Sequence, residues 1–144
     1  MTNSPRVILA NLNISQLPAG THAIAYAEVQ YDDPTLGSSL STDKAPIDVT
    51  AQAPYQPQPD PKVQQYILTL AKYRQTQIAE TKLQAGDRTG AITMLQSATQ
   101  TAIQMGDQNA ATVLQENVTQ LQTGQDLSEQ AKKQTRIASK TILQ

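Results

Sequence analysis

The order of apolar and polar positions divides the chain into an extended part and a helical part. In residues 6–53 apolar residues tend to alternate with polar ones, which predicts strands with one apolar face. From Pro61 onward they recur at intervals of three and four, which predicts amphipathic helices. Residues 53–61 separate the two patterns and contain four prolines, which favour extended chain and exclude helix. The sequence therefore predicts a β unit over 1–53, a linker over 54–60 and a helical bundle over 61–144.

Three strands are predicted in the extended part, over 6–14, 21–31 and 45–53. Asp32-Asp33-Pro34 is a turn signal that ends the second strand, and residues 35–44 are predicted to be a polar loop. The second strand places its alanines on one face, together with Val29 and Tyr31. Three strands with open edges are a poor independent sheet. We expect this unit to pack on the helices, pair with another chain, or form part of a larger β-sandwich.

Four helices are predicted, over about 61–85, 88–105, 108–122 and 127–142. Asp60 is a good N-cap, and Pro61 suits the first helical position. Gly86-Asp87 and Gly106-Asp107 each combine a C-cap glycine with the N-cap of the next helix, twenty positions apart. This spacing is similar to a tetratricopeptide hairpin but shorter than its unit of about 34 residues, so a small up-down bundle is predicted.

Helical spacing also predicts which residues of the first three helices face inward. The predicted inward residues are Val63, Ile67, Leu70, Arg74 and Ile78 in the first helix, Ala91, Met94, Leu95, Ala98, Ala102 and Met105 in the second, and Ala111, Leu114, Val118 and Leu121 in the third. The predicted fold class is α+β, with a short antiparallel β unit of about three strands followed by a three- to four-helix bundle.

Composition limits the size of the core and the classes of partner. Hydrophobic residues make up 38% of the chain, and Phe, Trp and Cys are absent. A core built from aliphatic residues and five Tyr is light, and a partner surface is one way to supplement it. The net charge of −1 argues against a general nucleic-acid or anionic-membrane binder. Without cysteine, disulfides and thiolate metal sites are excluded.

The first twenty residues lack the basic start and apolar run of a signal peptide, and no window approaches the ~20 apolar residues of a membrane span. These features predict a cytoplasmic protein without a transmembrane segment.

Several residues are candidates for chemistry, each with a structural alternative. His22 has no neighbouring carboxylates at a metal-ligand spacing, so a surface strand position is the preferred interpretation. Asp32, Asp33 and Asp43 flank a loop and could hold a divalent metal, although Asp-Asp-Pro is also ordinary turn chemistry. The aspartates of the two Gly-Asp pairs are explained by helix capping. The sequence predicts no catalytic, cofactor or metal residues, and hence no enzyme.

Two further sets form a candidate interaction surface. Lys132, Arg136 and Lys140 lie at four-residue spacing on the last helix and could meet nucleic acid, acidic lipid or an acidic partner. No aromatic is interleaved with them, and a solvated face is the simpler interpretation. Tyr66 and Tyr73 lie one heptad apart on the first helix and suit either the core or a recognition groove.

The linker and the helical part contain several short motifs that together suggest a family. These are Tyr55-Gln56-Pro57-Gln58-Pro59, Ala71-Lys72-Tyr73-Arg74-Gln75, Lys82-Leu83-Gln84-Ala85-Gly86-Asp87, Ala110-Ala111-Thr112-Val113-Leu114-Gln115 and the closing Arg136-Ile137-Ala138-Ser139-Lys140-Thr141-Ile142-Leu143-Gln144. With them the chain resembles the C-terminal region of bacterial, especially cyanobacterial, von Willebrand factor type A domain proteins. The resemblance implies the end of a β-sandwich followed by a helical tail.

The family's metal site requires an Asp-x-Ser-x-Ser motif, which this sequence does not contain. Its metal-dependent adhesion therefore cannot be assigned to any residue. We expect a non-catalytic protein-interaction or scaffold region, acting through open strand edges or the helical surface, with another protein or a second copy as partner. A metal-dependent adhesion module at Asp32, Asp33 and Asp43, and nucleic-acid or acidic-partner binding by the basic last helix, are the alternatives.

Overall fold

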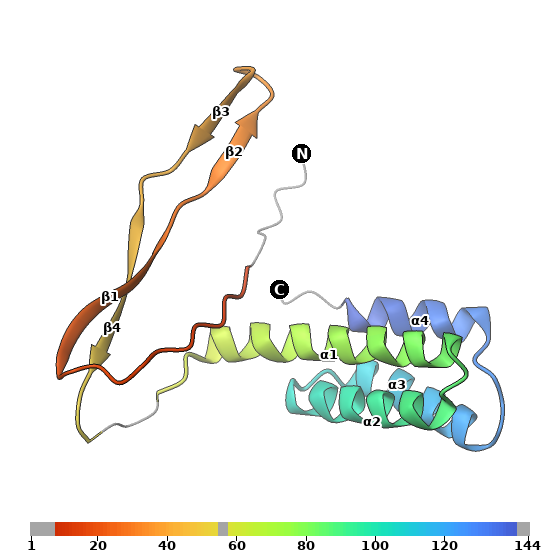
Figure 1. Cartoon of the computed structure of the whole chain (residues 1–144). Coiled ribbons are helices and arrows are strands. Elements are labelled where there is room, and N and C mark those ends of the chain that lie inside the picture. The colour runs from red at the N-terminus through yellow and green to blue at the C-terminus, as the bar shows by residue number, and fades with distance from the viewer. Residues whose placement is uncertain (1–7, 55–57, 141–144) are drawn as a thin grey trace. The chain divides into compact units, whose positions relative to one another are not determined.

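The computed structural model describes residues 8–54 and 58–140. The chain forms two compact units, one made by Ala10–Gln58 and one that contains all four helices within Pro59–Gln144. The first, here called the ribbon, holds four short antiparallel strands in two hairpin sheets, and the second, here called the helical unit, is a bundle (Figure 1). The predicted α+β class is confirmed.

The ribbon is one long hairpin with an interruption in each arm. β1 (Gly20–Ala27) pairs with β4 (Ala45–Ala51), and β2 (Gln30–Asp33) pairs with β3 (Ser38–Ser41). At the interruption the Val29 amide donates to the Thr42 hydroxyl at 3.0 Å, and the Thr42 amide donates to the Val29 carbonyl at 2.9 Å. Each sheet has only two strands, so every strand has one unpaired edge among the described residues.

Three strand predictions are wrong. Residues 8–14 form no strand, because no other strand pairs with them; residues 6 and 7 lie outside the described part. The single strand predicted over 21–31 is divided into β1 and β2, and the predicted polar loop over 35–44 contains β3. The serine-rich segment Ser38–Ser41 can form β3 because it pairs with β2. Both faces of this narrow hairpin meet water, so the strand does not need an apolar face.

The predicted apolar face of the second strand is also wrong. Ala23 and Ala27 are exposed, whereas His22, Ile24 and Ala25 are half-buried. The pairing register shifts between Ala23 and Ala25, so the alternation of faces changes at this bulge.

The helical unit consists of α1 (Pro61–Gln84), α2 (Arg88–Gln104), α3 (Gln108–Gln122) and α4 (Glu129–Ser139). Side-chain oxygens of Asp60, Asp87, Asp107 and Ser128 accept hydrogen bonds from backbone amides of the first turns. The serine cap explains why α4 begins later than the predicted residue 127. Residues 141–144 of the predicted last helix lie outside the described part.

Both Gly-Asp links end one helix and start the next by the same geometry. Gly86 and Gly106 have φ of 77° and 73°, and each sits in a turn where the following aspartate amide donates back to the helix, to the Lys82 carbonyl at 2.8 Å and the Ala102 carbonyl at 2.9 Å. The twenty-residue repeat is therefore a repeat of helix ends, as predicted.

The core of the helical unit lies where α2 and α3 meet and is closed by residues of α1 and α4. Of the predicted inward residues, all four of α3 are buried. Met94 of α2 and Met105 at its C-cap are only half-buried. Small side chains allow the helices to approach closely. The buried apolar residues that pack together are Ala79, Leu95, Ala98, Ala102, Ala110, Ala111, Leu114, Val118, Leu121, Leu127, Ala131 and Ala138.

The predicted inward face of α1 is wrong. Val63, Ile67 and Ile78 are exposed, and the buried residues of α1 are Lys72, Thr76 and Ala79. Lys72 can be buried because its ammonium lies 2.6 Å from a carboxylate oxygen of Asp107. Apolar periodicity therefore identified a face of α1, but one that points away from this core.

No helix within the described residues has the length and apolar content needed to cross a bilayer.

Candidate functional site

A groove of about 470 Å³ runs between α1 and α4. Leu95, Leu121 and Leu127 contribute apolar surface to it. Most of the other lining residues are polar, including Thr76, Gln77 and Gln84 of α1 and Glu129, Lys132, Thr135, Arg136 and Ser139 of α4. The groove therefore combines an apolar base with a hydrogen-bonding rim.

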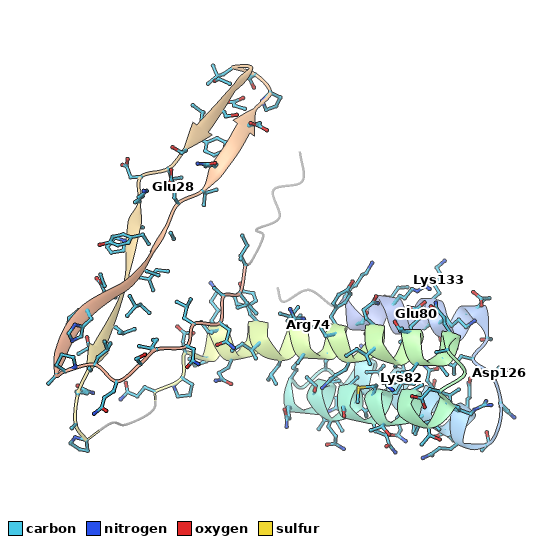
Figure 2. All side chains as sticks on the ribbon, viewed as in Figure 1. Glu28, Arg74, Glu80, Lys82, Asp126 and Lys133 are labelled. Atoms are coloured by element: carbon cyan, nitrogen blue, oxygen red, sulfur yellow. The ribbon has the colours of Figure 1, made fainter. Side chains whose placement is uncertain are left out.

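Ion pairs occupy the charged rim of this groove. Arg136 donates through Nη2 to Glu80 Oε1 across the groove, and Lys132 Nζ lies 2.6 Å from Glu129 Oε1. Figure 2 shows Glu80 on α1 and Lys133 on the neighbouring α4. The hydrogen bond that Arg136 donates to Glu80 raises the pKa of Arg136, and the hydrogen bond that Glu129 accepts from Lys132 lowers the pKa of Glu129.

Two of the three predicted basic residues are therefore compensated by carboxylates, and the third, Lys140, is exposed at the C-cap of α4. The face offers less positive potential to a phosphate backbone than its sequence indicates. The nucleic-acid hypothesis gains no support from this arrangement.

The two predicted tyrosines lie on α1 outside the lining of the groove. Tyr66 is half-buried and Tyr73 is 36% exposed, so Tyr73 is not a core residue. The predicted interaction surface thus separates into two places, with Lys132 and Arg136 at the groove and the tyrosines elsewhere on α1.

The acidic loop of the ribbon is a hydrogen-bonded turn. Asp33 Oδ1 accepts from the Thr35 amide at 2.8 Å, and this bond lowers the pKa of Asp33. Asp32 accepts from the Ser39 hydroxyl, whereas Asp43 lies in the connection from β3 to β4. Across residues 8–54 and 58–140, no three histidine, aspartate or glutamate side chains gather as a metal site would require.

His22, the other residue considered for a metal role, lies on β1. Its Nε2 is 2.9 Å from the Pro18 carbonyl oxygen, which indicates a structural hydrogen bond on the ribbon surface.

The buried pair Lys72–Asp107 was missed by the sequence interpretation. Lys72 is fully buried, and Asp107 combines two roles, because Oδ2 binds Lys72 while Oδ1 accepts from the Ala110 amide at 3.0 Å. The pair fixes the middle of α1 to the corner between α2 and α3. The available signal was the spacing of Lys72 with Thr76, Ala79 and Leu83, which marks a second face of α1.

Two other connections between helices were also missed. Arg88, at the start of α2, donates to the Leu121 carbonyl of α3 at 3.0 Å and to the Gln125 carbonyl in the link after α3. Buried Asn117 of α3 donates to the Thr135 hydroxyl of α4. Neither contact has a local sequence signal, because each joins residues brought together only by the packing of the helices.

Comparisons with known proteins place the helical unit in a family. A family model described as "Sll0103-like, C-terminal alpha-helical domain" matches residues 61–144. The chain is 58% identical over 145 residues to "Uncharacterized protein sll0103" of Synechocystis sp., covering 100% of this chain and 34% of that protein. The chain thus spans about a third of the length of this relative. No solved structure matches.

The family match covers all four helices, including both Gly-Asp links and the groove between α1 and α4. The relative matches over the ribbon as well. The chain therefore belongs to the Sll0103-like proteins and carries their C-terminal alpha-helical domain.

Proposed function

We propose that this chain is a non-catalytic protein-interaction or scaffold region of a von Willebrand A-type protein. In this proposal the helical unit is the stable body, and the ribbon is the element that joins further protein. The observation that carries the proposal is that no described residue between 8 and 54 is fully buried. A two-stranded ribbon without a core is at best marginally stable in water, so its pairing requires additional contacts.

The pairing register supplies the ribbon with one apolar face. Residues opposite each other share a face, so Ala25, Ile47 and Val49 lie on one side and Thr21 and Thr50 on the other. The two threonines also share a hydrogen bond of 3.1 Å. The apolar side suits packing on a second layer, and the open edges suit the addition of strands.

Large apolar side chains of the ribbon are left in water. They are Leu12, Ile14, Tyr26, Val29, Tyr31, Leu36 and Ile47. Exposed apolar residues gathered on one small unit are typical of protein-interaction surfaces. In the Synechocystis relative about two thirds of the protein lies outside the region matched by this chain, which makes that part the first candidate to cover the ribbon.

Hydrogen exchange tests the proposal. The amides of β1 and β4 are expected to exchange rapidly in this chain alone and slowly in the full-length relative, while amides of α2 and α3 are protected in both. Equal, slow exchange of the strands in a monomer of this chain would show that the ribbon is stable without a partner. Rapid exchange in the full-length relative would show that nothing covers it there.

A binding assay identifies the face involved. The unmatched part of the relative is mixed with this chain and with two variants, Ile47→Lys on the apolar face and Thr50→Lys on the opposite face. We expect Ile47→Lys to weaken binding at least about tenfold and Thr50→Lys to have a much smaller effect, because only the first buries a charge at the contact. Equal effects of the two variants would contradict burial of the apolar face.

A further inference from the structure

The groove between α1 and α4 is apolar at one end and polar at the other. Leu121 and Leu127 line it where α3 ends and α4 begins. Thr76, Glu80 and Ser139 line it further along, where α4 ends beside the middle of α1. Figure 1 shows α4 beside the C-terminal half of α1, with the start of α4 near the end of α1. An occupant that matches both ends of the groove is therefore amphipathic.

The two hydroxyl groups at the polar end donate their protons within their own helices. Thr76 Oγ1 donates to the Tyr73 carbonyl at 2.7 Å, and Ser139 Oγ donates to the Arg136 carbonyl at 2.9 Å. Both hydroxyl residues are buried, and both line the groove. A hydroxyl that donates to a backbone carbonyl offers a ligand its acceptor lone pairs. The polar end therefore presents oxygen acceptors to an occupant.

Negative charge gathers at this same end of the groove. Glu80 lies one helical turn after Thr76 on α1 and pairs with Arg136 of α4. The Glu80 side chain is 28% exposed and that of Arg136 is 57% exposed, so the carboxylate is the more enclosed member of the pair. α4 ends at Ser139, and the last carbonyl groups of a helix carry partial negative charge. A cation is thus favoured at the polar end.

We propose that this groove binds a small aliphatic amine, with its alkyl chain against the leucines and its ammonium among Glu80, Thr76 and Ser139. An ammonium has three donors and no acceptor, which matches a set of acceptor oxygens. The volume of about 470 Å³ lies within the range of small-molecule sites. This inference goes beyond the proposed function, because it assigns a ligand to the helical unit and involves no residue of the ribbon.

An aliphatic carboxylate is the competing ligand, since Lys132 and Arg136 also line the groove. Both cations already pair with carboxylates, Lys132 with Glu129 and Arg136 with Glu80. The complete lining contains three carboxylates, including Asp126, and these two cations. At the polar end a carboxylate would meet Glu80 and the lone pairs of the two hydroxyls, and like charges repel. The groove should therefore prefer an amine to an acid of equal length.

Three ligands of one chain length test this preference. Hexylammonium, 1-hexanol and hexanoate are titrated at pH 7 into the whole chain, and binding is measured by calorimetry and by amide NMR shifts. We expect a Kd of about 1 mM for hexylammonium, as suits a ligand this small, with shifts concentrated on the groove residues. Hexanol should bind more weakly, and hexanoate at least about tenfold more weakly.

Variants of the polar end test the assigned residues. Glu80→Gln should weaken hexylammonium at least about fivefold, because a charge-assisted hydrogen bond is lost. It should also strengthen hexanoate, since Arg136 loses its carboxylate partner. A general loosening of α4 would not reverse the preference in this way. Glu116→Gln is the matched control, because Glu116 is exposed on α3 and lies outside this groove.

Ser139→Ala removes one acceptor and leaves the pair of Glu80 and Arg136 in place. It should weaken hexylammonium about twofold or more, and it decides the matter if Glu80→Gln proves unfolded by circular dichroism. The proposal is overturned if hexylammonium fails to bind at up to about 20 mM, or if hexanoate binds as tightly. Shifts centred outside the groove, or affinities unchanged by both variants, would overturn it equally.

Discussion

Leu95 and Leu121 of the helical unit are each 2% exposed, whereas Ile47 of the ribbon is 38% exposed. The helices satisfy their backbone hydrogen bonds within each element, so packing four of them needs only one matching face from each. The strands satisfy half of theirs and enclose nothing, because each sheet has two strands. The helical unit is therefore stabilised by its own core, whereas no described residue of the ribbon is fully buried.

The two units also differ in net charge. Residues 10–58 contain five acidic and one basic residue, for a net charge of −4, and residues 61–144 contain nine basic and six acidic residues, for a net charge of +3. The near-neutral whole chain therefore conceals an acidic ribbon and a basic helical unit. Partners of the ribbon are expected to carry compensating positive charge.

The largest expected loss of stability within the helical unit comes from Asp107→Ala. It removes the N-cap of α3 and leaves the fully buried Lys72 without this carboxylate, which lies 2.6 Å away. Breaking a buried pair from one side costs about 3–5 kcal/mol. We expect the free energy of unfolding, measured by urea titration of the helical circular dichroism signal, to fall by about 4 kcal/mol.

The repeat provides the control for this variant. Asp87 occupies the same place one repeat earlier and caps α2, but it is exposed and pairs with the partly exposed Lys82. Asp87→Ala should lower stability far less than Asp107→Ala. Equal losses would show that capping, and not the buried pair, is the main contribution of these aspartates.

A core substitution compares the two units directly. Leu114 is fully buried at the contact of α2 and α3, so Leu114→Ala should cost about 3 kcal/mol through lost burial and a cavity. Ile47→Ala in the ribbon should change the unfolding of this chain by less than about 0.5 kcal/mol. Thermal melts of both variants test this contrast, and a large effect of Ile47→Ala would mean that the ribbon has a core of its own.

A smaller effect is expected from Arg88→Lys, which keeps the charge. The guanidinium donates from Nε to Leu121 and from Nη2 to Gln125, and a single ammonium cannot reproduce this fork. The expected loss is about 1 kcal/mol in urea unfolding. The matched variant Arg74→Lys, on the outer face of α1, should leave the free energy of unfolding unchanged. A similar loss in that variant would argue against a specific role for Arg88.

The helix ends could be predicted because they depend on local chemistry. Gly86, Asp87, Gly106 and Asp107 act on the turns next to them, and the structure places caps at each aspartate. The inward residues of α3 were also predicted correctly, since this helix has one apolar face. The groove between α1 and α4 was not predicted, because it depends on which sides of the two helices meet.

The face of α1 could not be chosen from the sequence. Val63, Ile67 and Ile78 form the more apolar side, but the bundle buries the side of Lys72, whose partner lies in a distant link. In the ribbon, β3 was missed because its serines show no alternation, and residues 8–14 alternate without forming a strand. Apolar periodicity identifies the face of a helix or strand that suits burial. Whether that face is buried depends on the element that packs against it.

The smallest expected effects concern two aspartates, one in each unit, of which Asp33 is half-buried and Asp87 is exposed. Asp33 and Asp87 both have a pKa lowered from the ordinary value of 3.8, Asp33 by the Thr35 amide and Asp87 by the Lys82 ammonium. Because the folded pKa lies below the unfolded one, each carboxylate stabilises the fold above the unfolded value and loses that contribution as the pH falls through the folded pKa. The weakening therefore begins below about pH 4.

Carboxyl-carbon NMR between about pH 2 and pH 6 separates the two units. Thr35→Pro removes the amide donor and should return the pKa of Asp33 toward its ordinary value without changing that of Asp87, and Lys82→Met should do the reverse. Protonation of Asp33 should disturb the nearby ribbon signals, whereas the weakening of the helical melt should follow the protonation of Asp87, since the two carboxylates belong to different compact units. If protonation of Asp33 also shifted the melting of the helical unit, the two units would be coupled, and the ribbon could not be treated as dependent on a partner alone.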